Sequence, residues 1–246
     1  MKKFIISLFG LIVLSNAAYS QANPGYLGKK QLVEIKGNLS VGSFLFGSGN
    51  FDKDFEVNYE FSRSKSSAWQ FGYRNASMSL RNDNNGDFYA IPTYYDGNST
   101  YFYSKGMANI AVNEVYFTPK FFQTQKGAIA PYGSYVGLEL ALAKLSLKDT
   151  TGFGWTSGIS NVQYNPVYLF STTLQFGVRR IIADQFALNY GFSTGIGLYN
   201  TASTSIYDIS EENQYNSPDE ALQHAMSNNY ACGKLFKVYF GVGYLF

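Results

Sequence analysis

The chain has little of the chemistry on which most metal proteins and many enzymes depend. Its 246 residues include one cysteine, Cys232, and one histidine, His224. A single cysteine excludes an intrachain disulfide framework and any zinc cluster built on cysteines, and a single histidine excludes multi-histidine metal sites. We therefore expect no metal and no cofactor.

Charge is also scarce. Charged residues make up 15% of the chain, against about 25% in an ordinary soluble domain. The 19 basic residues exceed the 17 acidic ones only through Lys2 and Lys3, which lie in a segment expected to be removed. A mature chain without net charge offers no electrostatic footprint for nucleic acid.

The first twenty residues have the three parts of a secretory signal peptide. A basic start, Met1–Lys3, precedes an apolar run of eleven residues, Phe4–Leu14, and the small polar stretch Ser15–Ser20. Eleven residues are too few for a spanning helix, which needs about 20. We expect cleavage after Ser20, with Ala22 as the alternative. The predicted organisation is a signal peptide at 1–20, a short periplasmic segment at 21–30 and one domain at 31–246.

What the chain does have is aromatic residues, with 21 Tyr and 21 Phe, in a period of two. Eight segments after residue 30 alternate bulky apolar residues with small or polar ones. In one of them Phe55, Val57 and Tyr59 alternate with Glu56 and Asn58. Period two is the strand period. The bulky face carries no charge in the seven clearest segments, which indicates strands with lipid outside and a narrow polar lumen inside. A soluble β-sandwich is the alternative.

The connections alternate in length, too. Short ones, at 64–66, 123–130 and 181–185, separate longer ones at 43–54, 79–109, 145–166 and 199–233. This is the arrangement of an up-and-down barrel in an outer membrane. The predicted fold is all-β: an eight-stranded antiparallel up-and-down transmembrane β-barrel with short periplasmic turns and four longer outer loops.

The C-terminus carries a family resemblance. Phe240, Val242, Tyr244 and the terminal Phe246 alternate with small or polar residues, and this pattern resembles the terminal signature of Gram-negative outer-membrane β-barrels. The whole mature chain looks like the small eight-stranded group of OmpA-transmembrane, OmpX and OmpW type. The resemblance implies residence in the cell outer membrane, contact with its lipid, reading of the signature by the barrel-assembly machinery, and a monomer.

The small polar faces of the strands also carry isolated charges. We expect ten of them to form a lumen network: Glu34, Lys36, Glu56, Glu60, Arg74, Glu114, Lys120, Glu139, Arg179 and Lys237. Five acids and five bases can neutralise one another in a plugged core, because an eight-stranded bore is only just wide enough for side chains. The alternative is a narrow ion-selective path along the same residues.

His224 is the one candidate for catalysis, since some small outer-membrane barrels are lipid-A-modifying enzymes. Ser217 and Glu220 form a capping box, and Pro218 fits the first turn, so a short helix in the fourth outer loop is predicted. Ser227 lies three residues after His224, but the spacing demands no Ser–His–acid arrangement, and the His-x-Ser spacing of lipid-A deacylases is absent. We expect a surface helix with an incidental histidine and no enzyme.

The function expected from the sequence is therefore a non-enzymatic surface or structural barrel whose outer loops, rich in Tyr, Asn, Ser and Gly, make contacts. The alternative is a small OmpW-like transport barrel for small apolar or ionic solutes. A lipid-A-modifying enzyme and an accessory of a secretion machine are weaker alternatives.

Overall fold

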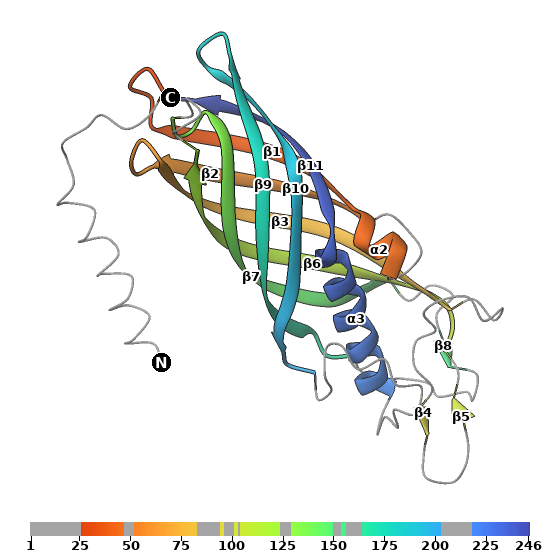
Figure 1. Ribbon diagram of the computed structural model, residues 1–246. Coiled ribbons are helices and arrows are strands. Elements are labelled where there is room, and N and C mark those ends of the chain that lie inside the picture. The colour runs from red at the N-terminus through yellow and green to blue at the C-terminus, as the bar shows by residue number, and fades with distance from the viewer. Residues whose placement is uncertain are drawn as a thin grey trace.

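The computed structural model describes residues 26–46, 52–82, 94–95, 101–102, 104–123, 129–149, 154–155, 164–202 and 218–246. The predicted signal peptide lies outside the described residues. Eight long strands build a barrel (Figure 1). They are β1 (Gln31–Ser40), β2 (Asp52–Ser62), β3 (Ser67–Asn82), β6 (Ser104–Phe122), β7 (Gly133–Asp149), β9 (Val167–Ile182), β10 (Phe186–Asn200) and β11 (Lys237–Leu245).

The barrel is closed and antiparallel throughout. Each long strand pairs with its neighbour in sequence, and β1 pairs with β11 to complete the ring. Following register partners once around from Val136 leads back to β7 at Ser146, ten residues further along. Such a stagger tilts the strands and leaves an interior that side chains can fill. The predicted fold class is confirmed.

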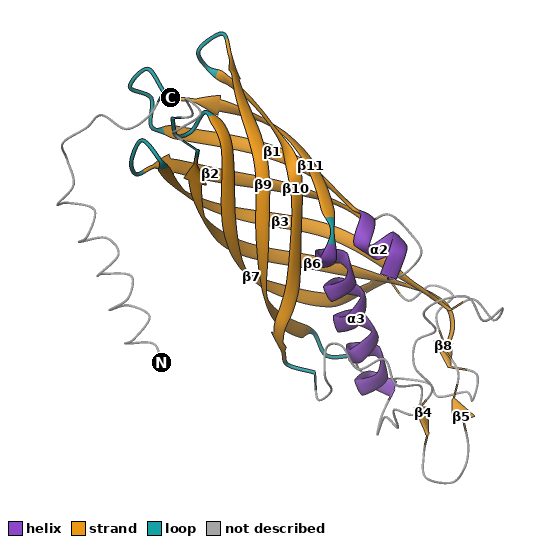
Figure 2. Cartoon of the chain, in the orientation of Figure 1, coloured by secondary structure: helices purple, strands orange, loops and turns teal. Residues whose placement is uncertain are grey.

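Smaller elements gather at one end. Helices α2 (Val41–Phe46) and α3 (Pro218–Leu235) lie opposite the short turns, as do the two-residue strands β4 (Tyr94–Tyr95), β5 (Tyr101–Phe102) and β8 (Gly154–Trp155) (Figure 2). We call this the outer end, and the end with the short turns the inner end. No helix in the described parts of the chain is long and apolar enough to cross a membrane, a finding that concerns helices alone.

The strands differ in how far they extend at the outer end. β11 begins at Lys237, opposite Ser193, so the rest of β10 has no partner in β11. Helix α3 lies beside this free stretch, and the Thr194 hydroxyl donates a hydrogen bond of 2.7 Å to the carbonyl of Leu235. The two helices therefore stand where the shorter strands end.

The pleat sorts the side chains by polarity. Phe55 and Leu140 face outward and are 70% and 40% exposed, whereas Glu56 and Glu139, one position away from each, are each 1% exposed. Aromatic rings pair across neighbouring strands on this exterior, as Phe176 and Phe192 do at 5.1 Å between centroids. An apolar exterior around a polar interior reverses the order of a soluble protein and suits a closed barrel in lipid.

A polar row ends the apolar exterior on three strands. Asn75, Asn113 and Lys144 are register neighbours on β3, β6 and β7 and face outward. The Asn75 amide donates to the Asn113 carbonyl oxygen at 3.1 Å, and the Tyr73 hydroxyl donates to the same oxygen at 2.5 Å. This row marks the outer margin of the lipid-facing surface, beyond which β3, β6 and β7 continue.

Candidate functional site: the filled lumen

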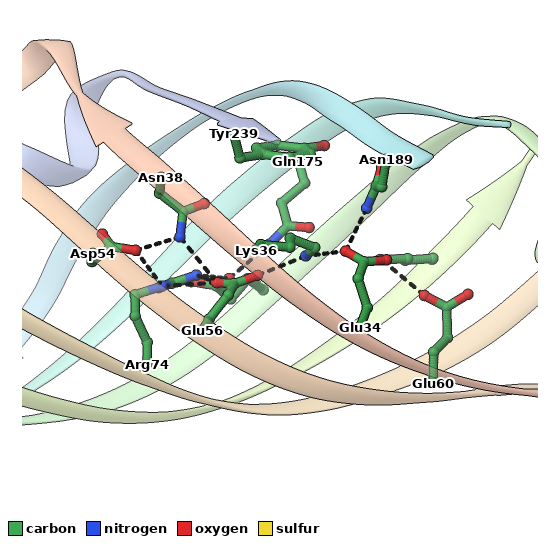
Figure 3. Close-up of polar contacts among 12 residues, drawn as sticks. Glu34, Lys36, Asn38, Asp54, Glu56, Glu60, Arg74, Gln175, Asn189 and Tyr239 are labelled. Carbon is green, nitrogen blue, oxygen red and sulfur yellow. Dashed lines mark hydrogen bonds and ion pairs between the residues drawn. The ribbon is translucent and has the colours of Figure 1, made fainter. Parts of the chain in front are cut away.

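The ten lumen residues predicted from the sequence all lie inside the barrel. Nine are at most 5% exposed, and the Lys237 side chain is 11% exposed. They come from seven strands, which converge because every second side chain of each strand points to the axis. The structure brings all ten into one continuous set of ion pairs, part of which Figure 3 shows.

The inner cluster consists of Glu34, Glu60, Lys120 and Arg179. Arg179 spans the bore, with Nη1 2.5 Å from Glu60 Oε1 and Nη2 2.9 Å from Glu34 Oε2. Lys120 Nζ lies 2.8 Å from Glu60 Oε2. The amide of Asn189 donates to Glu34 Oε1 at 2.8 Å. Two acids and two bases are thus paired with no charge left over.

The outer cluster is centred on Arg74. Its guanidinium contacts three glutamates from three other strands: Glu56 at 2.7 Å, Glu139 at 3.0 Å, and Glu114. Forked contacts of this kind hold carboxylates in fixed positions. Lys36 joins the two clusters, with Nζ 2.7 Å from Glu56 Oε1 and 3.5 Å from Glu34 Oε1.

Two members of the network were missed by the sequence prediction. Asp54 lies in β2, two residues before Glu56 and on the same inward face, and it binds Lys237 at 2.7 Å. Extending the alternation of β2 by two residues towards its start would have found it. Lys234 belongs to α3, and no strand pattern could have placed it inside. The described network therefore holds six acids and six bases: Glu34, Asp54, Glu56, Glu60, Glu114 and Glu139 with Lys36, Arg74, Lys120, Arg179, Lys234 and Lys237.

Tyrosines close the bore beside the inner cluster. The hydroxyls of Tyr135 and Tyr239 lie 3.0 Å apart, and Tyr135 also donates to the Asn189 side-chain oxygen at 3.0 Å. Both tyrosines are buried. Towards the short turns, apolar side chains follow, in two small clusters built around Phe122 and around Leu32 with Leu245.

At the outer end, α3 closes the barrel with an apolar face. Leu222, Met226 and Tyr230 recur every four residues and pack on the interior side chains of β3, β6, β7 and β9. The wall residues in this core are Met78, Leu80, Ile110, Val112, Ala143, Leu145, Val167 and Leu169. The charged layer is thus enclosed between two apolar layers.

The predicted helix begins at Pro218 as expected, but the prediction of a short helix on the surface is wrong. The helix runs from Pro218 to Leu235 and packs into the outer mouth, and His224 on it is only 4% exposed. The helix continues through Asn228, Asn229 and Gly233, which are poor helix formers. Packing of the apolar face against the wall outweighs that low propensity.

The helix also bears on catalysis. Ser227 Oγ donates to the carbonyl of Gln223, one turn earlier, at 2.8 Å. That hydroxyl is engaged by its own helix, which does not support a nucleophile activated by His224. Within the described residues no three His, Cys, Asp or Glu side chains are arranged to hold a metal ion.

The four residues of the C-terminal signature face outward from β11. Phe240, Val242, Tyr244 and Phe246 are between 44% and 56% exposed. Phe246 and Gln31 exchange two backbone hydrogen bonds, at 2.9 and 3.1 Å, at the seam where the barrel closes. The signature is therefore presented to lipid along the closing strand.

Comparison with known proteins gives distant structural likenesses. No protein-family model and no curated protein matches the sequence. Among solved structures, the crystal structure of Ail, the attachment invasion locus protein of Yersinia pestis, matches with a TM-score of 0.41 and 8% identity, in complex with the heparin analogue sucrose octasulfate. A nanodisc structure of Ail matches with a TM-score of 0.36 and 13% identity. Each match covers 89% of this chain and 99% of that one.

Because these TM-scores are low, the protein's class is inferred from its own exterior and interior. A closed ring of eight strands, an apolar exterior and a buried, charge-balanced interior together satisfy what a bilayer demands of a β-structure. The protein is a closed, membrane-spanning barrel of eight strands, which confirms the fold predicted from the sequence and agrees with the predicted place in the outer membrane.

Proposed function

We propose that this protein is a sealed, non-catalytic barrel that acts at the cell surface through the parts of the chain at its outer end. The observation that carries the proposal is the filled lumen. Six acids and six bases are paired between two apolar layers. An eight-stranded bore has little room beyond its own side chains.

Transport is the weaker function because its path would cross costly contacts. A solute passing the inner cluster would have to separate Arg179 from Glu34 and Glu60, all of which are fully buried. Breaking a buried pair costs about 3–5 kcal/mol when it leaves an uncompensated charge. The alternative of a small transport barrel is therefore disfavoured.

A surface role instead uses the strand extensions and loops at the outer end of the barrel. β3, β6 and β7 continue past the polar row of Asn75, Asn113 and Lys144, and their interior faces are covered by α3. The loops predicted to make contacts lie largely outside the described residues. Their Tyr, Asn, Ser and Gly suit adaptable recognition.

Planar-bilayer recording separates the two functions. Purified protein reconstituted without detergent should give no steady single-channel steps, because the lumen is closed at several levels.

A second experiment replaces residues 83–93 by a short Gly-Ser linker. The readout for surface contact is the attachment of cells that display the protein to a test surface. This attachment should fall, while the outer-membrane level of the protein and its heat-modified gel mobility stay unchanged. Steady conductance in the first experiment would favour transport.

The remaining expectations concern biogenesis and assembly. The barrel-assembly machinery is proposed to read Phe240, Val242, Tyr244 and Phe246. The folded protein is proposed to be a monomer, and sedimentation in detergent of matched density would test this by giving the mass of one chain.

A further inference from the structure

Lys234 is the only lysine of the described network that does not come from a strand. Its Nζ lies 2.8 Å from Glu114 Oε1 and 3.3 Å from Glu139 Oε1. Its side chain is 1% exposed. One turn earlier, the Tyr230 hydroxyl donates to the second oxygen of Glu114. The C-terminal part of α3 therefore presents an ammonium group to two carboxylates of the wall.

The charge count shows why the wall needs that ammonium. Without α3, the described strands supply six acids but five bases to the network: Lys36, Arg74, Lys120, Arg179 and Lys237. Lys237 lies at Asp54, and Lys120 lies in the inner cluster, so neither reaches Glu114. Glu114 would then share Arg74 with Glu56 and Glu139. The wall by itself has one uncompensated negative charge at this level.

Buried acceptors next to these carboxylates also favour a cation. Gln175 donates its amide to Glu139 Oε2 at 2.7 Å, while its own Oε1 is buried and has no hydrogen-bond partner in the described structure. Thr173, the register partner of Glu139, is 3% exposed and its hydroxyl likewise has no such partner. Both acceptors belong to side chains that neighbour Glu139, and a group with several N–H donors can satisfy such buried acceptors together with the carboxylate.

The rest of the bore does not depend on α3. The Tyr135–Tyr239 hydrogen bond and the inner cluster lie on strands alone. Movement of α3 would therefore open a vestibule that ends at the inner cluster and would leave the lumen closed.

We propose that Glu114 and Glu139 form a cation site in the barrel wall, that Lys234 fills this site from within, and that small primary ammonium ions compete with Lys234 and loosen α3 from the outer mouth. A primary ammonium carries the same three donors as the lysine head group. A quaternary ammonium has the charge without the donors, so it does not compete. The cation site does not depend on the surface role proposed above. The inner cluster keeps the lumen sealed whether α3 is docked in the outer mouth or loosened from it.

The natural cysteine reports the position of α3. Cys232 is the single cysteine of the chain, lies two residues before Lys234, and is 8% exposed. Burial raises the pKa of its thiol, and both effects slow its reaction with a thiol reagent. The test measures the rate at which a membrane-impermeant methanethiosulfonate labels Cys232 in the full-length protein in nanodiscs, at fixed pH and ionic strength.

Methylammonium should raise the labelling rate of the unaltered protein at least tenfold and in a saturable way, whereas tetramethylammonium at equal concentration should leave it unchanged. Lys234→Met should label rapidly without any amine and should not respond further. The matched control is Lys144→Met, which removes an exposed, outward-facing lysine and keeps Lys234 and the lumen network. It should label slowly and respond to methylammonium like the unaltered protein.

Three results would overturn the proposal. The first is that methylammonium does not raise the Cys232 labelling rate of the unaltered protein. This measurement does not depend on the folding of any variant. The second is equal acceleration by tetramethylammonium, which would reduce the effect to charge screening. The third is slow labelling of Lys234→Met in a fraction that keeps heat-modified gel mobility. Conductance recorded alongside should be absent in every case; its appearance would count against the sealed barrel and not against the cation site.

Discussion

Tyr135 on β7 and Tyr239 on β11 place their hydroxyl oxygens 3.0 Å apart although two strands, β9 and β10, separate them in the wall. The contact therefore spans the bore and does not follow the wall. Tyr239 also donates to the backbone carbonyl of Phe176 at 3.0 Å. Close approach of these rings to the wall requires that β9 and β10 carry no side chains at the facing positions, which are Gly177 and Gly191.

Gly191 on β10 gives the first prediction. A Cβ atom there would overlap the carbonyl oxygen of Phe176 and the hydroxyl of Tyr239. Gly191→Ala should lower the free energy of unfolding by about 1–3 kcal/mol through overpacking. Gly37→Ala is the control, since a Cβ at Gly37 meets only Phe55, at 3.8 Å. Urea unfolding in lipid vesicles measures both, and equal stability of the two variants would contradict a tightly filled bore.

The second prediction concerns Arg74, which joins Glu56, Glu114 and Glu139. Arg74→Met leaves three buried carboxylates sharing fewer cations. The free energy of unfolding should fall by about 3–5 kcal/mol, the usual cost of removing one partner from a buried pair. Arg180→Met is the control, because Arg180 is exposed on the exterior and contacts Tyr132 at 3.3 Å.

Arg180→Met should leave stability nearly unchanged, because exposed polar contacts contribute little. Guanidinium unfolding followed by tryptophan fluorescence distinguishes the variants. If the arginine on the exterior proved as costly to remove as Arg74, the network would not be what stabilises the interior.

Prediction from the sequence succeeded where the strand period determines the outcome. Glu114 and Lys120 lie in the segment with the weakest alternation, yet both point inward as expected and are at most 1% exposed. Because adjacent residues of a strand face opposite sides, knowing one outward residue fixes its neighbours. That reasoning placed all ten predicted charges.

It failed for α3, for a physical reason. A helix that enters a barrel has no period in common with the strands, and Leu222, Met226 and Tyr230 resemble an ordinary amphipathic stripe. Whether such a stripe faces solvent or the mouth of the barrel depends on the apolar wall that receives it. That wall is assembled from Met78, Ile110 and other residues far apart in the chain. Lys234 was missed with the helix that carries it.

The third prediction tests the C-terminal signature. Phe246→Ala keeps the backbone hydrogen bonds with Gln31 and removes an outward ring that is 49% exposed. Insertion into the outer membrane of living cells should fall several-fold, whereas spontaneous folding into lipid vesicles should change little. Immunoblots of outer-membrane fractions, compared with gel-shift folding assays, provide the two readouts. A loss that is equal in cells and in vesicles would point to stability and not to recognition.

The most direct test of the whole account uses two adjacent residues of β7. Leu140 is 40% exposed on the exterior, and Glu139 is 1% exposed in the lumen. Single cysteines at these positions, in a Cys232→Ser background, are treated with a thiol reagent confined to the bilayer interior. We predict labelling of Leu140→Cys and none of Glu139→Cys, with both variants keeping heat-modified mobility. Labelling of Glu139→Cys alone would show that the faces are inverted, and labelling of neither would contradict a barrel that spans the membrane.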